Sequence, residues 1–168
     1  PFFDPRDATE LVLPFVFAEK PSLASLEAAS ILASHWGSLA KYRGARFPVQ
    51  LNELPSGNAV VFATEDQEIG GINTGRITGP TVTLMDNPSS QHGRLLLLLG
   101  RNAAELATAA RALALGEVLL TGRSSKVSEP QITPRLPYDA PNWVPTNRRV
   151  SLGEVIDPAQ LEGHGISP

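Results

Sequence analysis

The turn Lys20–Ser25, in "AEKPSLAS", holds the residues that could most readily bind a ligand. It follows a short apolar run and precedes a helical pattern, which is the place where α/β domains bind phosphate groups. A phosphate cradle needs glycines so that backbone N–H groups can approach the anion closely, and no glycine lies between Phe15 and Trp36. We therefore interpret Ser22 as a helix N-cap and Lys20 as a solvated side chain. A nucleotide or flavin held by this turn is the alternative.

Two further segments contain glycines but do not fit a nucleotide site. "LLGRNAAEL" has one glycine, Gly100, and Asn102 is explained as the cap of a second helix. "GGINTGRITG" has four glycines, but no buried strand precedes it and no helix follows it, so it fails the context test for a dinucleotide fingerprint. We expect a hairpin or a surface loop there.

No combination of residues indicates catalysis or a metal centre. His35, His92 and His164 do not have metal-ligand spacing, and the chain has no cysteine. There is no G-x-S-x-G elbow, and no acidic pair is obliged to share a cleft. We predict no catalytic residue, no cofactor and no metal ion, so the chain is expected not to be an enzyme.

Composition excludes some classes of partner. The 168 residues carry a net charge of −3, which argues against nucleic acid as a partner. The longest apolar runs, "LVLPFVFA" and "LLLLL", are too short to span a bilayer. Because the chain starts at Pro1, we interpret it as part of a longer or processed polypeptide, with any membrane attachment in segments outside it.

The elements expected around the turn belong to an α/β domain with a largely parallel sheet. A buried strand covers Leu11–Phe17 with a break near Pro14, and "RFPVQL" is a candidate edge strand. Helices start at Ser22 and Asn102 and end at Gly44 and Gly116. Further strands are expected at residues 59–64, 80–86, 94–100 and 118–120. The apolar stripe of the first helix comprises Leu26, Ala29, Leu32, Ala33, Trp36, Leu39 and Ala40.

Composition changes near Arg123. We predict an α/β domain at residues 1–122, a Pro-rich linker or strap at 123–149, and at 150–168 the start of another domain or a disordered tail. Tyr138 and Trp143 lie among the prolines of the strap. They are candidates for a domain interface or, with less weight, for a glycan contact.

Three stretches resemble the regulatory subunit of bacterial cellulose synthase. They are "PFVFAEKPSLASLEAASILASHWGSLAKYRGARFPV", "LLLLLGRNAAELATAARALALG" and "PYDAPNWVPTNRRVSLGEV", and they cover most of the chain. The family pattern has two adjacent aromatic residues where this chain has His35 and Trp36, and a proline where it has Arg149. These departures affect local packing and the path of the strap.

The resemblance implies a periplasmic, non-catalytic protein held in the inner membrane by a C-terminal anchor, in which carbohydrate-binding jelly rolls alternate with flavodoxin-like domains. This chain is then the first flavodoxin-like domain, followed by the start of a jelly roll at 150–168. The implied partners are the catalytic membrane glycosyltransferase that uses UDP-glucose, the nascent glucan and further copies of the regulatory subunit. Cyclic di-GMP sensing is assigned to the catalytic partner, because "DNPSSQHG" does not fit the usual binding motif.

Overall fold

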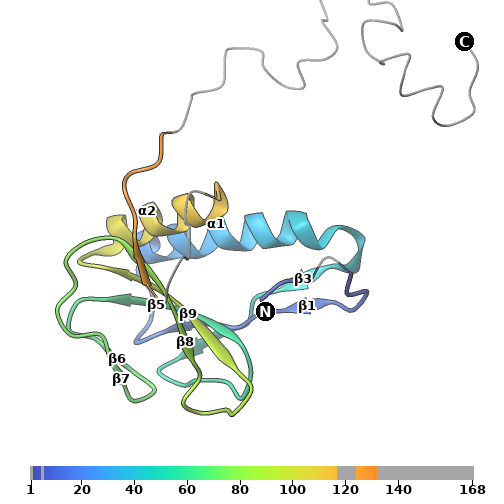
Figure 1. Cartoon of the computed structure of the whole chain (residues 1–168), viewed down its shortest axis with the longest axis horizontal. Helices are drawn as coiled ribbons and strands as arrows, with labels where there is room; N and C mark the ends of the chain where they lie inside the picture. The colour runs from blue at the N-terminus through green and yellow to red at the C-terminus, as the bar shows by residue number, and fades with distance from the viewer. Residues whose placement is uncertain (1, 5, 117–123, 132–168) are drawn as a thin grey trace, which may run out of the picture. The chain divides into compact units, whose positions relative to one another are not determined.

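A six-stranded sheet and two helices form the framework of the domain (Figure 1). The structure is a computed structural model that describes residues 2–4, 6–116 and 124–131. The unit that contains the sheet runs from Pro1 to Pro130. Its elements are β1 (Leu11–Val12), β2 (Phe15–Phe17), α1 (Leu23–Ala40), the 3-10 helix η1 (Lys41–Arg43), β3 (Ala45–Arg46), β4 (Val49–Leu51), β5 (Ala59–Thr64), β6 (Glu68–Ile69), β7 (Ile72–Asn73), β8 (Thr81–Asp86), β9 (Arg94–Gly100), α2 (Ala103–Ala114) and β10 (Ser124–Lys126).

The sheet is mixed, with the strand order β10-β8-β9-β5-β2-β4. Strands β4, β2, β5 and β9 are parallel to one another, whereas β8 is antiparallel to β9 and to β10. The α/β class is therefore confirmed, but the sheet is less parallel than expected. The reason is the short loop between β8 and β9, because a parallel pair needs a crossover of about a dozen residues or more.

The first strand breaks where proline predicts it. Pro14 separates β1, which pairs with β3, from β2, which pairs with β4 and β5. The carbonyl of Pro14 still accepts a hydrogen bond from the N–H of Val60 at 2.9 Å, so only the missing donor interrupts the ladder. The "RFPVQL" segment supplies β4, an edge strand, as expected.

Both helices start at the predicted caps. The Ser22 hydroxyl accepts a hydrogen bond from the N–H of Ser25, and the Asn102 side chain accepts one from the N–H of Glu105. Helix α1 ends at Ala40, earlier than expected, because Lys41 leaves the helical conformation at φ 53°. The short helix η1 then reaches Gly44 at φ 76°, and the chain after α2 reaches Gly116 at φ 73°. These positive φ values explain glycine at both ends.

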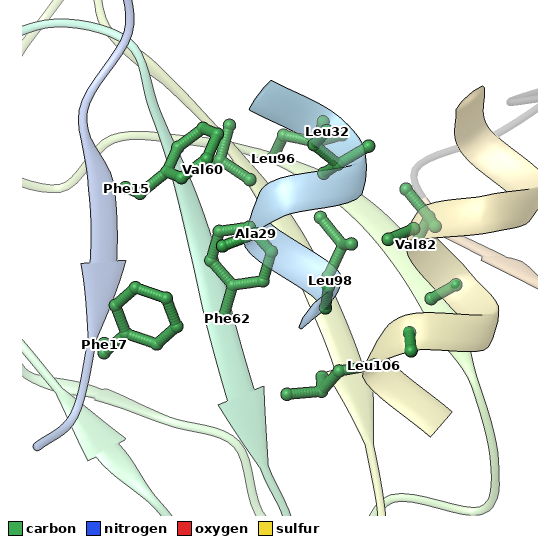
Figure 2. Packing of buried hydrophobic residues seen from close by; sticks show 14 of the residues in the cluster. Phe15, Phe17, Ala29, Leu32, Val60, Phe62, Val82, Leu96, Leu98 and Leu106 are labelled. Carbon is green, nitrogen blue, oxygen red and sulfur yellow. The ribbon is translucent and has the colours of Figure 1, made fainter. Parts of the chain in front are cut away.

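The main core lies between the sheet and the two helices (Figure 2). Alternate strand residues point toward the helices, among them Phe15, Phe62 and Leu98. Trp36 is buried in this core, as predicted. Two residues of the expected stripe, Leu26 and Leu39, are instead 39% and 43% exposed. They lie at the two margins of the stripe, which is wider than the arc that contacts the sheet.

The opposite face of the sheet has no helix among the described residues. Its buried residues pack under Leu54 and under Ile69 of the β6–β7 hairpin. Helices α1 and α2 lie side by side on the other face (Figure 1). Strand β10, which follows α2, is antiparallel to β8 and therefore parallel to β9, so β9, α2 and β10 form a β-α-β unit with β8 between its two strands. Within the described residues, helices therefore cover only one face of the sheet.

The glycine-rich segment forms the expected hairpin. Gly70 and Gly71 connect β6 to β7 with φ values of 54° and 84°, the pair of positive values that a two-residue hairpin turn requires. Ser124–Lys126 lie in the range expected as linker, yet they pair with β8 as β10. The expected strand at 118–120, the rest of the strap with Tyr138 and Trp143, and the segment 150–168 lie outside the described residues. No helix in the described ranges is long and apolar enough to cross a membrane.

Candidate functional site

A hollow of about 320 Å³ lies at the carboxyl ends of the parallel strands. Its lining comes from the end of β2, from β5, and from the first residues of α1 and α2. Strand β2 leads through α1 to β4 on one side, and β5 lies on its other side, so the hollow opens where the strand order reverses. This is the position at which open α/β sheets bind ligands. Its volume is within the range of small-molecule sites.

The Lys20–Ser25 turn lines one side of the hollow. The Ser22 hydroxyl is committed to the N–H of Ser25 at 3.1 Å, and the two hydroxyl groups are 3.0 Å apart. Lys20 is exposed. The structure therefore brings the predicted candidates to the ligand-binding edge, while Ser22 acts as the predicted cap.

The start of α2 lines the opposite side through Arg101, Asn102 and Ala103, and Glu105 holds Arg101 there. Glu105 accepts hydrogen bonds from the backbone N–H of Arg101 at 2.8 Å and from the Arg101 Nε at 2.7 Å, and its carboxylate also pairs with Nη2. The side-chain hydrogen bond from Arg101 is the main cause that lowers the pKa of Glu105. A negative charge is stabilised at a helix N-terminus, so Glu105 stands where an anionic ligand would bind.

Gly100 has a packing role in this turn. A Cβ atom at this position would lie 2.7 Å from the Cβ of Glu105 and 3.0 Å from the backbone N of Leu106. Only glycine lets the end of β9 approach α2 so closely. The single glycine of "LLGRNAAEL" thus serves helix–strand contact.

The floor and back wall of the hollow are committed to internal contacts. Phe17 and Phe62 stack at 5.0 Å with an interplanar angle of 12°, and both are buried. On the wall, Gln67 Oε1 accepts a hydrogen bond from the N–H of Thr64 at 2.9 Å, and the Thr74 hydroxyl donates to the Thr64 carbonyl at 2.9 Å. An incoming ring would find no free aromatic face on this floor.

The titratable groups do not form an acid–base pair in the described part of the chain. Hydrogen bonds from Arg6 lower the pKa of Asp4, and hydrogen bonds from Thr9 lower the pKa of Asp7. Both shifts favour the charged form, whereas a general acid at neutral pH needs a raised carboxyl pKa. No group of His, Asp or Glu in the described ranges could hold a metal ion.

The histidines are not brought together by the fold. His35 is half-buried on α1 beside Trp36, with ring centroids 6.3 Å apart, and His92 is exposed in the β8–β9 loop. His164 lies outside the described residues, as do Tyr138 and Trp143.

The segment "DNPSSQHG" forms the β8–β9 loop and is held by a buried amide. Asn87 is 3% exposed, and its Nδ2 donates to the carbonyls of Pro55 and Gly57, each at 2.7 Å. Its Oδ1 accepts from the N–H of Ser89 at 2.9 Å. The Asn87 side chain therefore ties this loop to the segment between β4 and β5 and fixes the turn at Ser89.

One cluster was missed by the sequence reasoning. The Arg43 side chain is 5% exposed and binds the N-terminal segment. Its partners lie 36 and 39 residues earlier in the chain, so no local pattern indicates the contact.

Comparison with known proteins places this fold in a family. The family model described as "Cellulose synthase BcsB, first FD domain" matches residues 1–127. A cyclic di-GMP-binding protein of Pseudomonas fluorescens (strain SBW25) is 48% identical over 172 residues, which cover 100% of this chain and 23% of that protein. The protein of the same name in Escherichia coli (strain K12) is 40% identical over 171 residues, covering 100% of this chain and 22% of that protein.

A third relative carries a different name. Cellulose synthase 2 of Novacetimonas hansenii is 40% identical over 169 residues, covering 100% of this chain and 10% of that protein. The chain thus spans about a quarter or less of the length of these three relatives. The resemblance found in the sequence is confirmed.

Proposed function

The chain belongs to the cellulose synthase BcsB family, and from this membership we propose that it is a non-catalytic scaffold and interaction domain of the family's regulatory subunit. The full-length protein is periplasmic and tethered to the inner membrane by segments outside this chain. The domain supports cellulose synthesis and glucan translocation by the membrane glycosyltransferase subunit, which is its main partner. Nascent glucan and copies of the regulatory subunit are further partners under this proposal.

The observation that carries the proposal is the state of the ligand-binding edge. Glu105 is bonded to Arg101 at the start of α2, Ser22 caps α1, and the Gln67 side chain is bonded to the backbone of Thr64. Catalytic and cofactor sites need polar groups that are held ready for a substrate, often with pKa values shifted toward the reaction pH. Here the polar groups stabilise the two turns, which is what a rigid support for neighbouring domains requires.

The same arrangement supports a flavodoxin-like origin for the fold. The parallel strands β4, β2, β5 and β9 and the hollow beyond β2 and β5 follow the doubly wound pattern. We propose a flavodoxin-like domain that has one helical face and has lost the ligand. The second face is closed by a loop and a hairpin.

Cyclic di-GMP is proposed to act at the catalytic partner and not at this domain. The relatives' names refer to proteins of which this chain is about a quarter or less. The β8–β9 loop, which carries the nearest sequence to the binding motif, is held by Asn87. A loop whose amide is committed to the backbone of Pro55 and Gly57 has less to offer a nucleotide.

The strap is proposed to fix the angle to the next domain. Tyr138 and Trp143 lie among prolines that restrict the chain to extended conformations, so little backbone entropy remains to be lost on docking. Under this proposal Trp143 is covered by protein, and residues 150–168 begin a jelly roll. Acrylamide should quench Trp143 weakly in a Trp36→Phe background. Strong quenching together with a shift on adding cello-oligosaccharide would make Trp143 a sugar contact.

Two measurements test the main proposal. Calorimetric titration of this chain with FMN, UDP-glucose and cyclic di-GMP should give no saturable heat at micromolar ligand. In the full-length protein, Lys20→Glu at the hollow and Lys126→Glu on β10 should support the same rate of glucan synthesis with the catalytic subunit. Saturable heat that Lys20→Glu alone abolishes would support the second candidate, a nucleotide- or flavin-binding domain, which the volume of the hollow favours.

A further inference from the structure

A second feature lies at the corner between α1 and β3, formed by Lys41, Tyr42 and Arg43 (Figure 1). The hollow borders the start of α1, and this corner follows its end, about 25 Å away along a helix of 18 residues. A small cavity of about 70 Å³ opens beside the corner and is also lined by Phe3, Asp7 and Leu39. Nothing in the proposed scaffold role accounts for the conformation of this corner.

Lys41 adopts a backbone conformation that a lysine rarely takes. Its φ is 53° and its ψ is −130°. A residue with a side chain in such a region costs about 1–3 kcal/mol, and strain of this kind gathers at binding sites. The conformation turns the chain sharply after α1, with Tyr42 left outside and Arg43 inside.

Tyr42 is 91% exposed. An aromatic ring of this size gains much from burial, so a fully solvated one presents a free apolar face. Leu39, one turn earlier, is also exposed and lines the same cavity.

Arg43 forms the fixed wall of the corner. Its Nη1 donates to the carbonyls of Asp4 at 3.0 Å and Asp7 at 2.8 Å, and its guanidinium lies 4.6 Å from the ring centroid of Phe3. The Asp7 carboxylate is 3.8 Å away and 51% exposed. The Arg43 Nε has no hydrogen-bond partner among the described residues. The guanidinium is thus immobilised with part of its donor capacity unused.

The side chains at the corner determine which class of ligand can bind there. The Lys41 side chain can donate hydrogen bonds, the Asp7 carboxylate can accept them, and the Tyr42 ring offers an apolar face. The Asp7 carboxylate and the negative face of the Tyr42 ring oppose an anion and offset its attraction to Lys41. A neutral polyhydroxylated chain satisfies all of these groups, because its C–H faces pack on the ring while its hydroxyl groups both donate and accept.

We propose that the corner Lys41–Arg43, with Asp7, binds one or two sugar units of a glucan chain. This inference rests on the proposed function. In a cellulose synthase family, the polyhydroxylated chain available to such a site is a β-linked glucan. Tyr42 provides the stacking face, and Asp7 and Lys41 orient the hydroxyl groups. Arg43 positions Asp7 and the N-terminal segment.

The test is a titration of the 168-residue chain with cellohexaose, followed by calorimetry and by NMR chemical shifts. Millimolar binding is expected, with shifts at Tyr42. Tyr42→Ala should weaken it by about tenfold or more, while Tyr42→Phe should keep it within about twofold because the ring remains. Leu23→Ala is the matched control, since Leu23 is 88% exposed at the other end of α1, and it should bind as the parent does.

Each contrary result overturns the site. Absence of cellohexaose binding at millimolar concentration excludes it, as does equal binding by Tyr42→Ala. Circular dichroism of each variant separates lost binding from lost folding. Co-purification of the full-length variants with the catalytic subunit tests the scaffold role separately. A Tyr42→Ala protein that binds cellohexaose normally but loses the catalytic subunit would make the corner a protein contact.

Discussion

Replacing Trp36 with alanine tests the core between α1 and the sheet. The side chain is 6% exposed, and its ring centroid lies 6.3 Å from that of Phe15. An aromatic residue buries about 150–250 Å², worth about 4–6 kcal/mol at about 25 cal/mol per Å². Compactness of the unfolded chain lowers this by about 10–40%, to about 2–5 kcal/mol. Truncations of buried tryptophan cost a similar amount, about 3–5 kcal/mol.

The assay is urea unfolding followed by circular dichroism, because the substitution removes a fluorescent probe. The expected midpoint shift corresponds to a free energy of unfolding lower by about 3–5 kcal/mol, which exceeds half the stability of many domains. Tyr42→Ala is the matched aromatic control, and it should change the free energy by less than about 0.5 kcal/mol because the ring is exposed. A loss below about 1 kcal/mol for Trp36→Ala would refute the burial and the packing of α1 on the sheet.

Three further substitutions test the turns. The pKa of Glu105 is lowered in the folded state, so its charged form stabilises the fold. This stabilisation is fully present above the pKa that Glu105 has in the unfolded chain, and it is lost as the pH falls through the folded-state pKa. In urea unfolding, the stability advantage of the parent over Glu105→Gln should therefore shrink between pH 7 and about pH 3. Asn87→Ala removes two hydrogen bonds from a buried side chain to the carbonyls of Pro55 and Gly57 and should cost about 1–3 kcal/mol in the same assay; a neutral effect would contradict the loop structure. Gly100→Ala should cost about 1–3 kcal/mol because its Cβ would meet the backbone of α2. The control Gly37→Ala has nothing within 4 Å of the added Cβ and should stabilise α1 by up to about 1 kcal/mol. Equal effects of the two substitutions would contradict the close approach of β9 to α2.

The elements that depend on local chemistry were predictable from the sequence. Ser22 and Asn102 cap their helices because a short polar side chain reaches the N–H three residues ahead, whatever the rest of the fold does. The strands Ala59–Thr64 and Arg94–Gly100 have the bounds that their apolar runs indicate. The break at Pro14 follows from its missing N–H.

The features that depend on the path of the chain were not predictable in this way. Strand β10 is an edge strand of serine and lysine with no apolar signal, so its pairing with β8 could not be predicted. The exposure of Leu26 and Leu39 depends on how wide an arc of α1 the sheet covers. The corner at Tyr42 depends on contacts that Arg43 makes with a segment far away in the sequence.

A hollow at the edge where α/β sheets usually bind ligands is weaker evidence for a ligand than the side chains that line the hollow. Parallel strands end there and the chain turns away to α1 on one side and α2 on the other, so a gap follows from topology alone. What a phosphate would need is an unoccupied helix N-terminus and close backbone approach. In this chain the N-terminus of α2 is neutralised by Glu105, and the close approach at Gly100 is used for the helix itself. The gap is thus the consequence of the strand order, and the chemistry left exposed is at the corner beyond the other end of α1.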